Sequence, residues 1–228
     1  LAAILANAQA AQRFLAKEPS DIDEVRDILN DIIEDDRQAG GVIQGLRLLL
    51  RKGEMRQEQF DVNEAVQSVL KLVRSDLLNA NVSVETDLAP YLPKILGDRV
   101  QLQQVLINLV INANEALADA ATIAALTAAI EALADQAPGH RRLVIRTGVG
   151  NDRQVWLEVL DNGHGIAAEQ IPHLFTPFYS TKAHGLGIGL SVCRRIIESH
   201  GGDLQAANRP EGGACFKFSL PAVAEETP

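Results

Sequence analysis

The stretch DNGHGIAAEQIPHLFTPFYSTKAHGLGIGL, residues 161–190, contains two clusters of glycine. The first, DNGHG, follows the apolar run VWLEVL, and the second, GLGIG at 185–189, opens an amphipathic helix. Glycine lets the backbone approach a ligand closely. The N–H groups and the dipole of a helix N-terminus favour an anion. The stretch therefore predicts a site for the phosphates of a nucleotide.

Two asparagines lie upstream, on a helix expected to begin near Asp98. Asn108 and Asn112 are four residues apart, so their side chains share one face. A neutral amide oxygen can ligate Mg²⁺ whose other positions go to phosphate oxygens and water. The alternative is that either amide caps a neighbouring loop. Glu115, one turn further on, either supports this site or is a solvated charge.

Two charged side chains flank the glycine clusters. Asp161 ends an apolar strand, where its carboxylate either accepts a hydrogen bond from an exocyclic amine or forms an Asx turn. Lys182 precedes the second cluster and either reaches a phosphate or is a solvated charge. That cluster reads GxGxG, so it lacks the spacing of a Rossmann motif and the GK[ST] ending of a P-loop.

The order of these motifs resembles that of the GHKL nucleotide-binding family, which includes gyrase, Hsp90, MutL and histidine kinases. Asn-x₃-Asn on a helix is followed by DNGxG after a strand, a segment rich in Phe and Pro, and GxGxGL at a helix start. The resemblance covers about residues 60–220. It implies a Bergerat α/β sandwich that binds ATP and Mg²⁺.

By this resemblance, Asn108 and Asn112 form the N box, with Asn112 as the metal ligand, and residues 166–184 form a mobile ATP lid. Asn108, Asn112 and Lys182 are the expected catalytic residues. Gly212 and Gly213 resemble the last glycine element. The expected nucleotide-binding residues are Asp161, Gly163, Gly165 and Ile166, the F-box residues Phe175 and Phe178, and Gly185, Leu186, Gly187, Ile188, Gly189 and Leu190.

Residues 1–53 have apolar residues at three- and four-residue steps, interrupted by KEPSD, which predicts a helical hairpin. We expect residues 1–52 of two copies to form a homodimeric four-helix bundle, with packing onto the rest of this chain as the alternative. The hairpin resembles the dimerisation and phosphoacceptor hairpin of sensor histidine kinases. Its opening, LAAILANAQAAQRFL, resembles the sequence that follows the acceptor histidine in the oxygen-sensing and nitrogen-regulating group.

No histidine lies in residues 1–52, because the five histidines are His140, His164, His173, His184 and His200. The resemblance of the opening residues implies a fragment that starts just after the acceptor histidine, and we expect that it cannot phosphorylate itself. His164 stands where proline is common in the family and is expected on a surface turn.

One substitution within the N box separates the activities of the family. In its ATPases, a glutamate one turn before the magnesium asparagine is the general base, whereas Asn108 cannot take a proton. The resemblance thus favours transfer of the ATP γ-phosphate to a histidine, for relay to an aspartate in the receiver domain of a response regulator. A GHKL ATPase clamp and a nucleotide-dependent scaffold without transfer are the alternatives.

Composition excludes other partners. A net charge of −9 argues against a nucleic-acid or anionic-membrane surface, so we expect neither nucleic acid binding nor membrane contact by this fragment.

Cys193 and Cys215 fall in an apolar helix and strand without CxxC spacing, which predicts buried free thiols in a reducing compartment. We expect a cytoplasmic location, with a full-length protein that is either soluble or membrane-anchored.

The expected fold class is α+β, a helical hairpin followed by an α/β sandwich with helices on one face of a mixed sheet. Smaller expectations are a strand at 60–62, a helix capped by Asp61 or Asn63, a hairpin of strands 143–149 and 155–160, and an extended helix or helical excursion in the Ala-rich residues 118–137. The expected domains are the hairpin at 1–53, a linker at 54–59, the ATP-binding domain at 60–222 and a tail at 223–228.

Overall fold

The computed structural model of the chain describes residues 2–16, 22–29, 31–32, 57–130, 141–150, 153–181 and 187–223. The chain divides into two compact units, each described by itself. One comprises Leu1–Lys52 and Thr176–Gly189, and the other, which contains the sheets, comprises Gly53–Phe175 and Leu190–Pro228.

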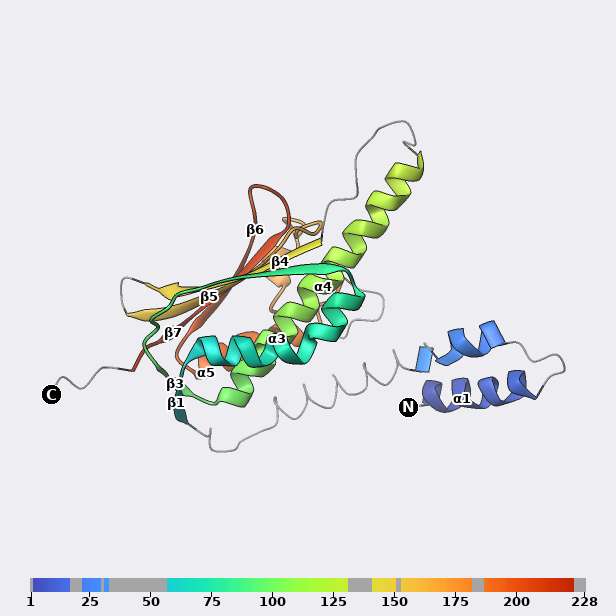
Figure 1. Ribbon diagram of the computed structural model, residues 1–228, viewed down its shortest axis with the longest axis horizontal. Helices are drawn as coiled ribbons and strands as arrows, with labels where there is room; N and C mark the ends of the chain where they lie inside the picture. Colours follow the sequence, from blue (N-terminus) through green and yellow to red (C-terminus); the bar gives the residue numbers. More distant parts are fainter. Residues whose placement is uncertain are drawn as a thin grey trace. The chain divides into compact units, whose positions relative to one another are not determined.

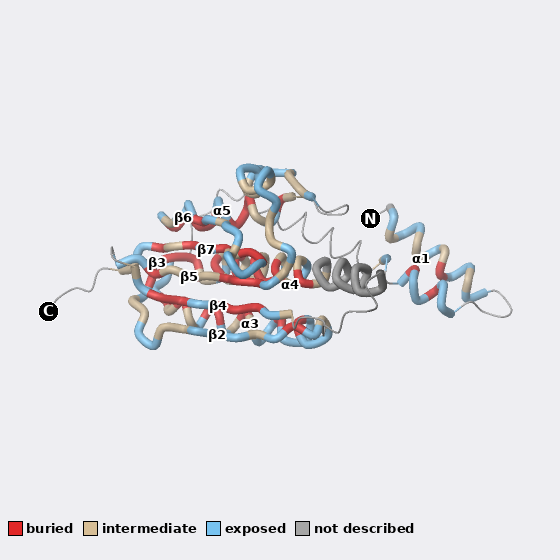
Figure 2. The backbone as a smooth tube through the Cα atoms, turned by 90° about the horizontal axis from the view of Figure 1, so that it is seen from above, coloured by how far each residue is buried: buried red, intermediate tan, exposed pale blue. Residues whose placement is uncertain are grey.

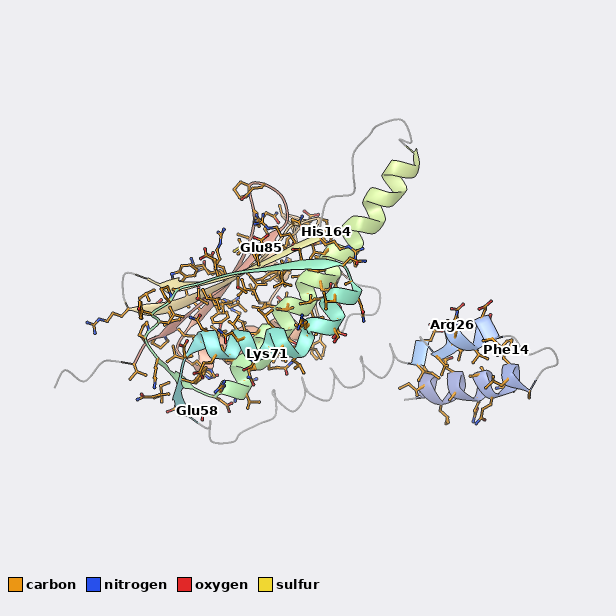
Figure 3. The ribbon with its side chains drawn as sticks, in the orientation of Figure 1. Phe14, Arg26, Glu58, Lys71, Glu85 and His164 are labelled. Atoms are coloured by element: carbon orange, nitrogen blue, oxygen red, sulfur yellow. The ribbon has the colours of Figure 1, made fainter. Side chains whose placement is uncertain are left out.

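The N-terminal segment forms two packed helices. Helix α1 spans Ala2–Leu15, and residues 22–29 and 31–32 are also helical. Ala11, Val25 and Ile28 are buried against one another, and Phe14 packs against them (Figure 3). The predicted helical hairpin is confirmed over these residues.

The sheet-containing unit mixes helices and strands along the chain, as coloured in Figure 1. Its elements in order are β1 (Glu58–Phe60), α3 (Val62–Asn79), β2 (Val82–Leu88), β3 (Ile95–Gly97), α4 (Arg99–Ile130), β4 (Arg141–Val149), β5 (Gln154–Asp161), the 3₁₀ helix η1 (Ile171–His173), α5 (Gly189–Ser199), β6 (Asp203–Asn208) and β7 (Ala214–Pro221).

The main sheet has five strands in the order β2-β4-β5-β7-β6. Strand β2 pairs with β4 in parallel and every other pair is antiparallel, so the sheet is mixed. Helices α3, α4 and α5 cover one face of this sheet (Figure 1). The predicted α/β sandwich is therefore confirmed, as is the β4–β5 hairpin. Strands β1 and β3 pair separately.

Helices α3 and α4 each begin at an aspartate whose carboxylate caps the helix. Asp61 accepts a hydrogen bond of 2.8 Å from the Asn63 N–H, which makes Asp61 the cap of α3. Asp98 caps α4 by accepting from Val100 and Gln101. The strand predicted at 60–62 is wrong by two residues, because the chain leaves the strand at Phe60 to let Asp61 cap the helix.

The Ala-rich segment lengthens α4, which continues as one helix to Ile130. This confirms an extended helix for the part of 118–137 that the structure describes. Within the described residues, no helix combines the length and apolar character needed to span a membrane.

The core lies between the helical layer and the sheet, where buried backbone is concentrated in Figure 2. Helix α3 buries one stripe at three- and four-residue steps, from Val62 to Leu77. The largest fully buried side chains of α4 and the main sheet are Leu102, Leu106, Leu109, Leu117, Leu143, Ile145, Leu157, Leu204, Phe218 and Leu220. Aliphatic side chains dominate this set, and only 4% of the residues of the chain are aromatic.

A buried histidine joins the C-terminus of α5 to the N-terminus of α4. The Nε2 atom of His200 accepts a 2.9 Å hydrogen bond from the Asp98 backbone N–H. Its Nδ1 lies 2.7 Å from the Ile196 carbonyl oxygen. Because Nε2 accepts, Nδ1 carries the proton and donates. A Cβ on Gly97 would collide with this ring, so Gly97 makes room for the histidine.

We expect His200→Ala to lower the free energy of unfolding by about 2–4 kcal/mol, because it leaves the Asp98 N–H unpaired and opens a cavity. Urea denaturation followed by circular dichroism measures this. The matched control is His173→Ala, which removes an exposed imidazole and should change stability by less than about 0.5 kcal/mol. Equal effects of the two substitutions would contradict the assignment.

Candidate functional site

The carboxylate of Asp161, at the end of β5, is the most buried polar group of the site, with 1% of the residue exposed. Its Oδ1 accepts hydrogen bonds from the backbone N–H groups of Gly163 at 2.8 Å and Ala214 at 3.2 Å. Within the described part of the chain, Oδ2 has no hydrogen-bond partner. One oxygen is thus held by the protein and the other is left for a ligand.

Burial raises the pKa of Asp161 above its ordinary value, because desolvation disfavours the charged form. The hydrogen bonds from Gly163 and Ala214 and the positive charge of Arg209 oppose this effect without cancelling it.

The glycines around Asp161 allow close contacts that a side chain would block. A Cβ on Gly163 would lie 2.9 Å from the carbonyl oxygen of Ala116 in α4, so the loop packs directly on that helix. Gly165 has φ of +77°, which favours glycine. Gly213, with φ of +84°, lies against the Asp161 backbone. The loop that follows β5 is therefore fixed between α4 and the β6–β7 turn.

The two asparagines of α4 have different surroundings. Asn108 is occupied, since its Oδ1 accepts from Gln104 Nε2 at 3.1 Å and its Nδ2 donates to Cys193 Sγ at 3.6 Å. Asn112 is half-buried, and among the described residues its side chain has no hydrogen-bond partner. Ala116, one turn after Asn112, touches the Asp161 loop. Asn112 therefore combines an available amide oxygen, a ligand suited to Mg²⁺, with a position near that loop.

Cys193 couples α4 to α5. It is fully buried, and burial raises the pKa of its thiol to about 12. Cys215 is half-buried and also has a free thiol. The expectation of free thiols is confirmed, and that of full burial is confirmed for Cys193 alone.

The two F-box phenylalanines are placed differently. Phe175 is half-buried, with the guanidinium of Arg194 from α5 5.2 Å from its ring centroid. Phe178 is 70% exposed and has φ of +67°, and its N–H donates to the Gly187 carbonyl at 3.0 Å. The aromatic ring of Phe175 is therefore packed and that of Phe178 is presented to solvent.

The second glycine cluster is described in part. Gly187 has φ of +64°, Ile188 is buried, and α5 begins at Gly189. Leu190 in the first turn is half-buried. The expectations for Lys182, Gly185 and Leu186 fall outside the described residues.

Three residues near Asp161 complete the site. His164 is exposed on the loop after β5, as expected of a surface turn (Figure 3). Sequence reasoning missed Asn208 and Arg209, at the end of β6. Asn208 hydrogen-bonds the backbone of Ile166, and Arg209 Nη1 donates to the Asp161 carbonyl at 2.7 Å. A polar pair between a strand and the turn PEGG was the available signal.

Comparison with known proteins gives the same architecture. The family model described as "Histidine kinase-, DNA gyrase B-, and HSP90-like ATPase" matches residues 97–224. The sensor protein FixL of Bradyrhizobium diazoefficiens is 34% identical over 226 residues, which cover 99% of this chain and 41% of FixL. The sensor histidine kinase TmoS of Ectopseudomonas mendocina is 34% identical over 223 residues, which cover 97% of this chain and 21% of TmoS.

A nucleotide-free structure of the catalytic domain of histidine kinase ThkA superposes with a TM-score of 0.58 at 28% identity, covering 74% of this chain and 97% of that domain. The chain spans 41% or less of the length of FixL and TmoS. The family model nonetheless matches more than half of the chain, and the chain superposes on the ThkA domain over 74% of its length. The chain therefore belongs to the histidine kinase-, DNA gyrase B- and HSP90-like ATPase family, and its relatives there include sensor histidine kinases.

Proposed function

We propose that this chain is the ATP-binding catalytic core of a sensor histidine kinase. It transfers the γ-phosphate of ATP to a histidine imidazole, from which an aspartate of a response regulator receives it. The observation that carries the proposal is the Asp161 carboxylate, buried with one oxygen held by two backbone N–H groups and the other left unpaired within the described chain. Such an acceptor matches the exocyclic amine of adenine.

Positioning and charge stabilisation supply most of the catalysis in phosphoryl transfer. Asp161 selects adenine, and Asn112 holds the magnesium ion through its amide oxygen. The metal ion, when bound, neutralises charge on the phosphate oxygens. Lys182 and the backbone N–H groups of Gly185, Gly187 and Gly189 hold the phosphates at the start of α5.

The surroundings of Asn108 support transfer over hydrolysis. A hydrolase needs a base that takes a proton from water, and Asn108 is an amide. Its two contacts are the amide of Gln104 and the thiol of Cys193, whose pKa burial raises to about 12. None of these three groups accepts a proton at neutral pH.

Exposed apolar side chains on the hairpin support a homodimer formed through residues 1–52. Leu5, Leu15, Ile22 and Leu29 are each about half exposed or more, so a second hairpin could bury apolar side chains that one copy leaves exposed. We also assign the chain to the cytoplasm, a reducing compartment suited to the two free thiols of Cys193 and Cys215.

A response regulator receiver domain is the proposed partner. ThkA, in complex with the response regulator TrrA, superposes with a TM-score of 0.66 at 23% identity, covering 99% of this chain and 59% of that chain. A likeness at that identity supports the fold, and the sensor kinase relatives FixL and TmoS support the partner by analogy.

A phosphotransfer assay tests the proposal. The chain is mixed with an intact acceptor hairpin from a related kinase and with ATP radiolabelled at the γ-phosphate. We expect acid-labile, base-stable label on the hairpin and none on this chain, since residues 1–52 lack histidine. The control hairpin has its acceptor histidine replaced by glutamine. Steady phosphate release without labelled hairpin would favour an ATPase clamp, and ATP binding without transfer or release would favour a scaffold.

Asp161→Asn separates ligand binding from stability. The asparagine Oδ1 can keep both backbone hydrogen bonds, whereas an NH₂ group replaces Oδ2 and faces the adenine amine as a second donor. We expect ATP affinity to fall roughly 30-fold or more, measured by calorimetric titration. A folded variant with unchanged ATP affinity would remove Asp161 from the adenine site.

The same substitution should make stability less sensitive to pH. Because the pKa of Asp161 is raised in the folded chain, its contribution to stability is present in acid and is lost as pH rises through that pKa. The amide that replaces the carboxylate does not ionise, so the unfolding free energy of Asp161→Asn relative to wild type should increase from acid to neutral pH. Urea denaturation across this range measures the difference, and a decrease would contradict the burial argument.

Asn112→Ala tests the metal ligand. We expect ATP affinity to fall roughly tenfold or more with Mg²⁺ present and to stay near the wild-type value in excess chelator. The matched control is Gln103→Ala, another half-buried amide on α4. A loss of equal size with and without Mg²⁺ would assign Asn112 to the nucleotide or to the fold instead of the metal.

A further inference from the structure

The side chain of Asn208 binds the backbone of one residue at two points. Its Nδ2 donates to the Ile166 carbonyl at 2.6 Å, and its Oδ1 accepts from the Ile166 N–H at 2.7 Å. Ile166 directly follows Gly165, the last glycine of the loop that begins at Asp161. Two hydrogen bonds to one peptide segment fix its orientation as well as its position.

The neighbouring residue holds the other end of the same loop. Arg209 Nη1 donates to the Asp161 carbonyl at 2.7 Å, so two consecutive residues at the end of β6 hold residues 161 and 166. The β6–β7 turn that carries them is itself closed by hydrogen bonds between Arg209 and Gly213 and between Gly212 and Arg209. The loop is therefore braced from a turn that lies about 45 residues further along the chain.

The contact between Asn208 and Ile166 requires particular residue types at positions 208 and 165. The Ile166 backbone offers one donor and one acceptor, and a short side-chain amide presents the complementary pair. Gly165 has φ of +77°, and a Cβ there would lie 2.9 Å from Asn208 Oδ1. Glycine at 165 is thus required both by the backbone conformation and by the close approach of the amide.

We propose that Asn208 is a positioning residue for ATP binding, which acts through Ile166 and contacts neither the nucleotide nor the metal. This inference rests on the proposed function, since the braced loop is the one that carries the adenine acceptor Asp161. With the brace, the loop is in its binding conformation before ATP arrives, so binding costs less ordering. Without it, the same contacts to ATP remain available but the loop must first be ordered.

Asn208 offers a clean test because its side chain is exposed, so its removal leaves no cavity and should not unfold the domain. Arg209 would be a poorer choice, since its charge also acts on the pKa of Asp161. Asn208→Leu keeps the approximate size and removes both hydrogen bonds. Asn208→Asp keeps the acceptor for the Ile166 N–H, but its second carboxylate oxygen replaces the donor and faces the Ile166 carbonyl oxygen. Gln205→Leu is the matched control, because Gln205 is an exposed amide on the same strand that bonds Asp203 instead.

Two measurements on the 228-residue chain test separately whether Asn208 holds the loop and whether this contact affects ATP binding. Hydrogen exchange without nucleotide should show the Ile166 amide exchanging roughly tenfold faster in Asn208→Leu than in wild type. In the assay with an acceptor hairpin, the KM for ATP should rise roughly three- to tenfold, with kcat changed less than the KM. Asn208→Asp should also raise both values above those of wild type, and Gln205→Leu should match wild type in both measurements.

An unchanged exchange rate of the Ile166 amide in Asn208→Leu would show that Asn208 does not hold the loop. Faster exchange with an unchanged KM and unchanged ATP affinity would overturn the positioning role, because the contact would then be structural only. Equal losses in Asn208→Leu and Gln205→Leu would overturn the assignment to this residue. If wild-type chain bound no ATP, the proposed function and the positioning role would both fall, whereas faster exchange in the variant would still support the brace itself.

Discussion

The hydrogen bonds to Asp161 Oδ1 tie together two parts of the chain that are distant in sequence. One comes from Gly163 in the loop after β5 and the other from Ala214 at the start of β7. Burial of a carboxylate is costly unless hydrogen bonds compensate, so the loop and the β6–β7 turn must keep their places for the charge to be tolerated. The glycine at 213 follows from this requirement, because a side chain there would collide with the Asp161 backbone, and a side chain at 163 would push the loop away from Ala116 of α4.

Helix α4 provides the surface on which this arrangement rests. Its N-terminus is capped by Asp98, whose backbone is held by His200 at the end of α5. Its middle carries Asn108, bonded to Cys193 of α5, and then Asn112. Ala116 follows one turn later, against the loop at Gly163. One helix therefore sets the spacing between the proposed metal ligand and the proposed adenine acceptor.

The sequence alone was sufficient for the class of fold, and it named the candidate residues of the site. Apolar periodicity predicts α3 and α4, alternation and a glycine turn predict the β4–β5 hairpin, and motif order points to Asn112 and Asp161. The boundary of β1 was missed by two residues, because a capping carboxylate at Asp61 and a strand residue look alike in sequence. Local patterns are informative wherever neighbours in sequence share one face of an element.

Contacts between distant residues were beyond such patterns. The partner of Asn108 is Cys193, 85 residues away, and sequence identifies Cys193 only as a thiol in an apolar helix. Asn208 lies 42 residues from Ile166, in a turn with no periodic signal. Phe175 and Phe178 belong to one motif, yet one ring packs under Arg194 and the other is exposed. Side-chain environment at each of these positions depends on tertiary packing.

Because Cys193 is buried where α5 contacts α4, the reactivity of its thiol reports whether these two helices have separated. A thiol reagent needs both access and a thiolate, and Cys193 lacks both while α4 and α5 stay together. Cys215, the other cysteine of the chain, is half-buried, so its thiol is partly accessible in the folded state. In a variant in which Cys215 is replaced, the alkylation rate of Cys193 measures how often α4, which carries Asn108, separates from α5.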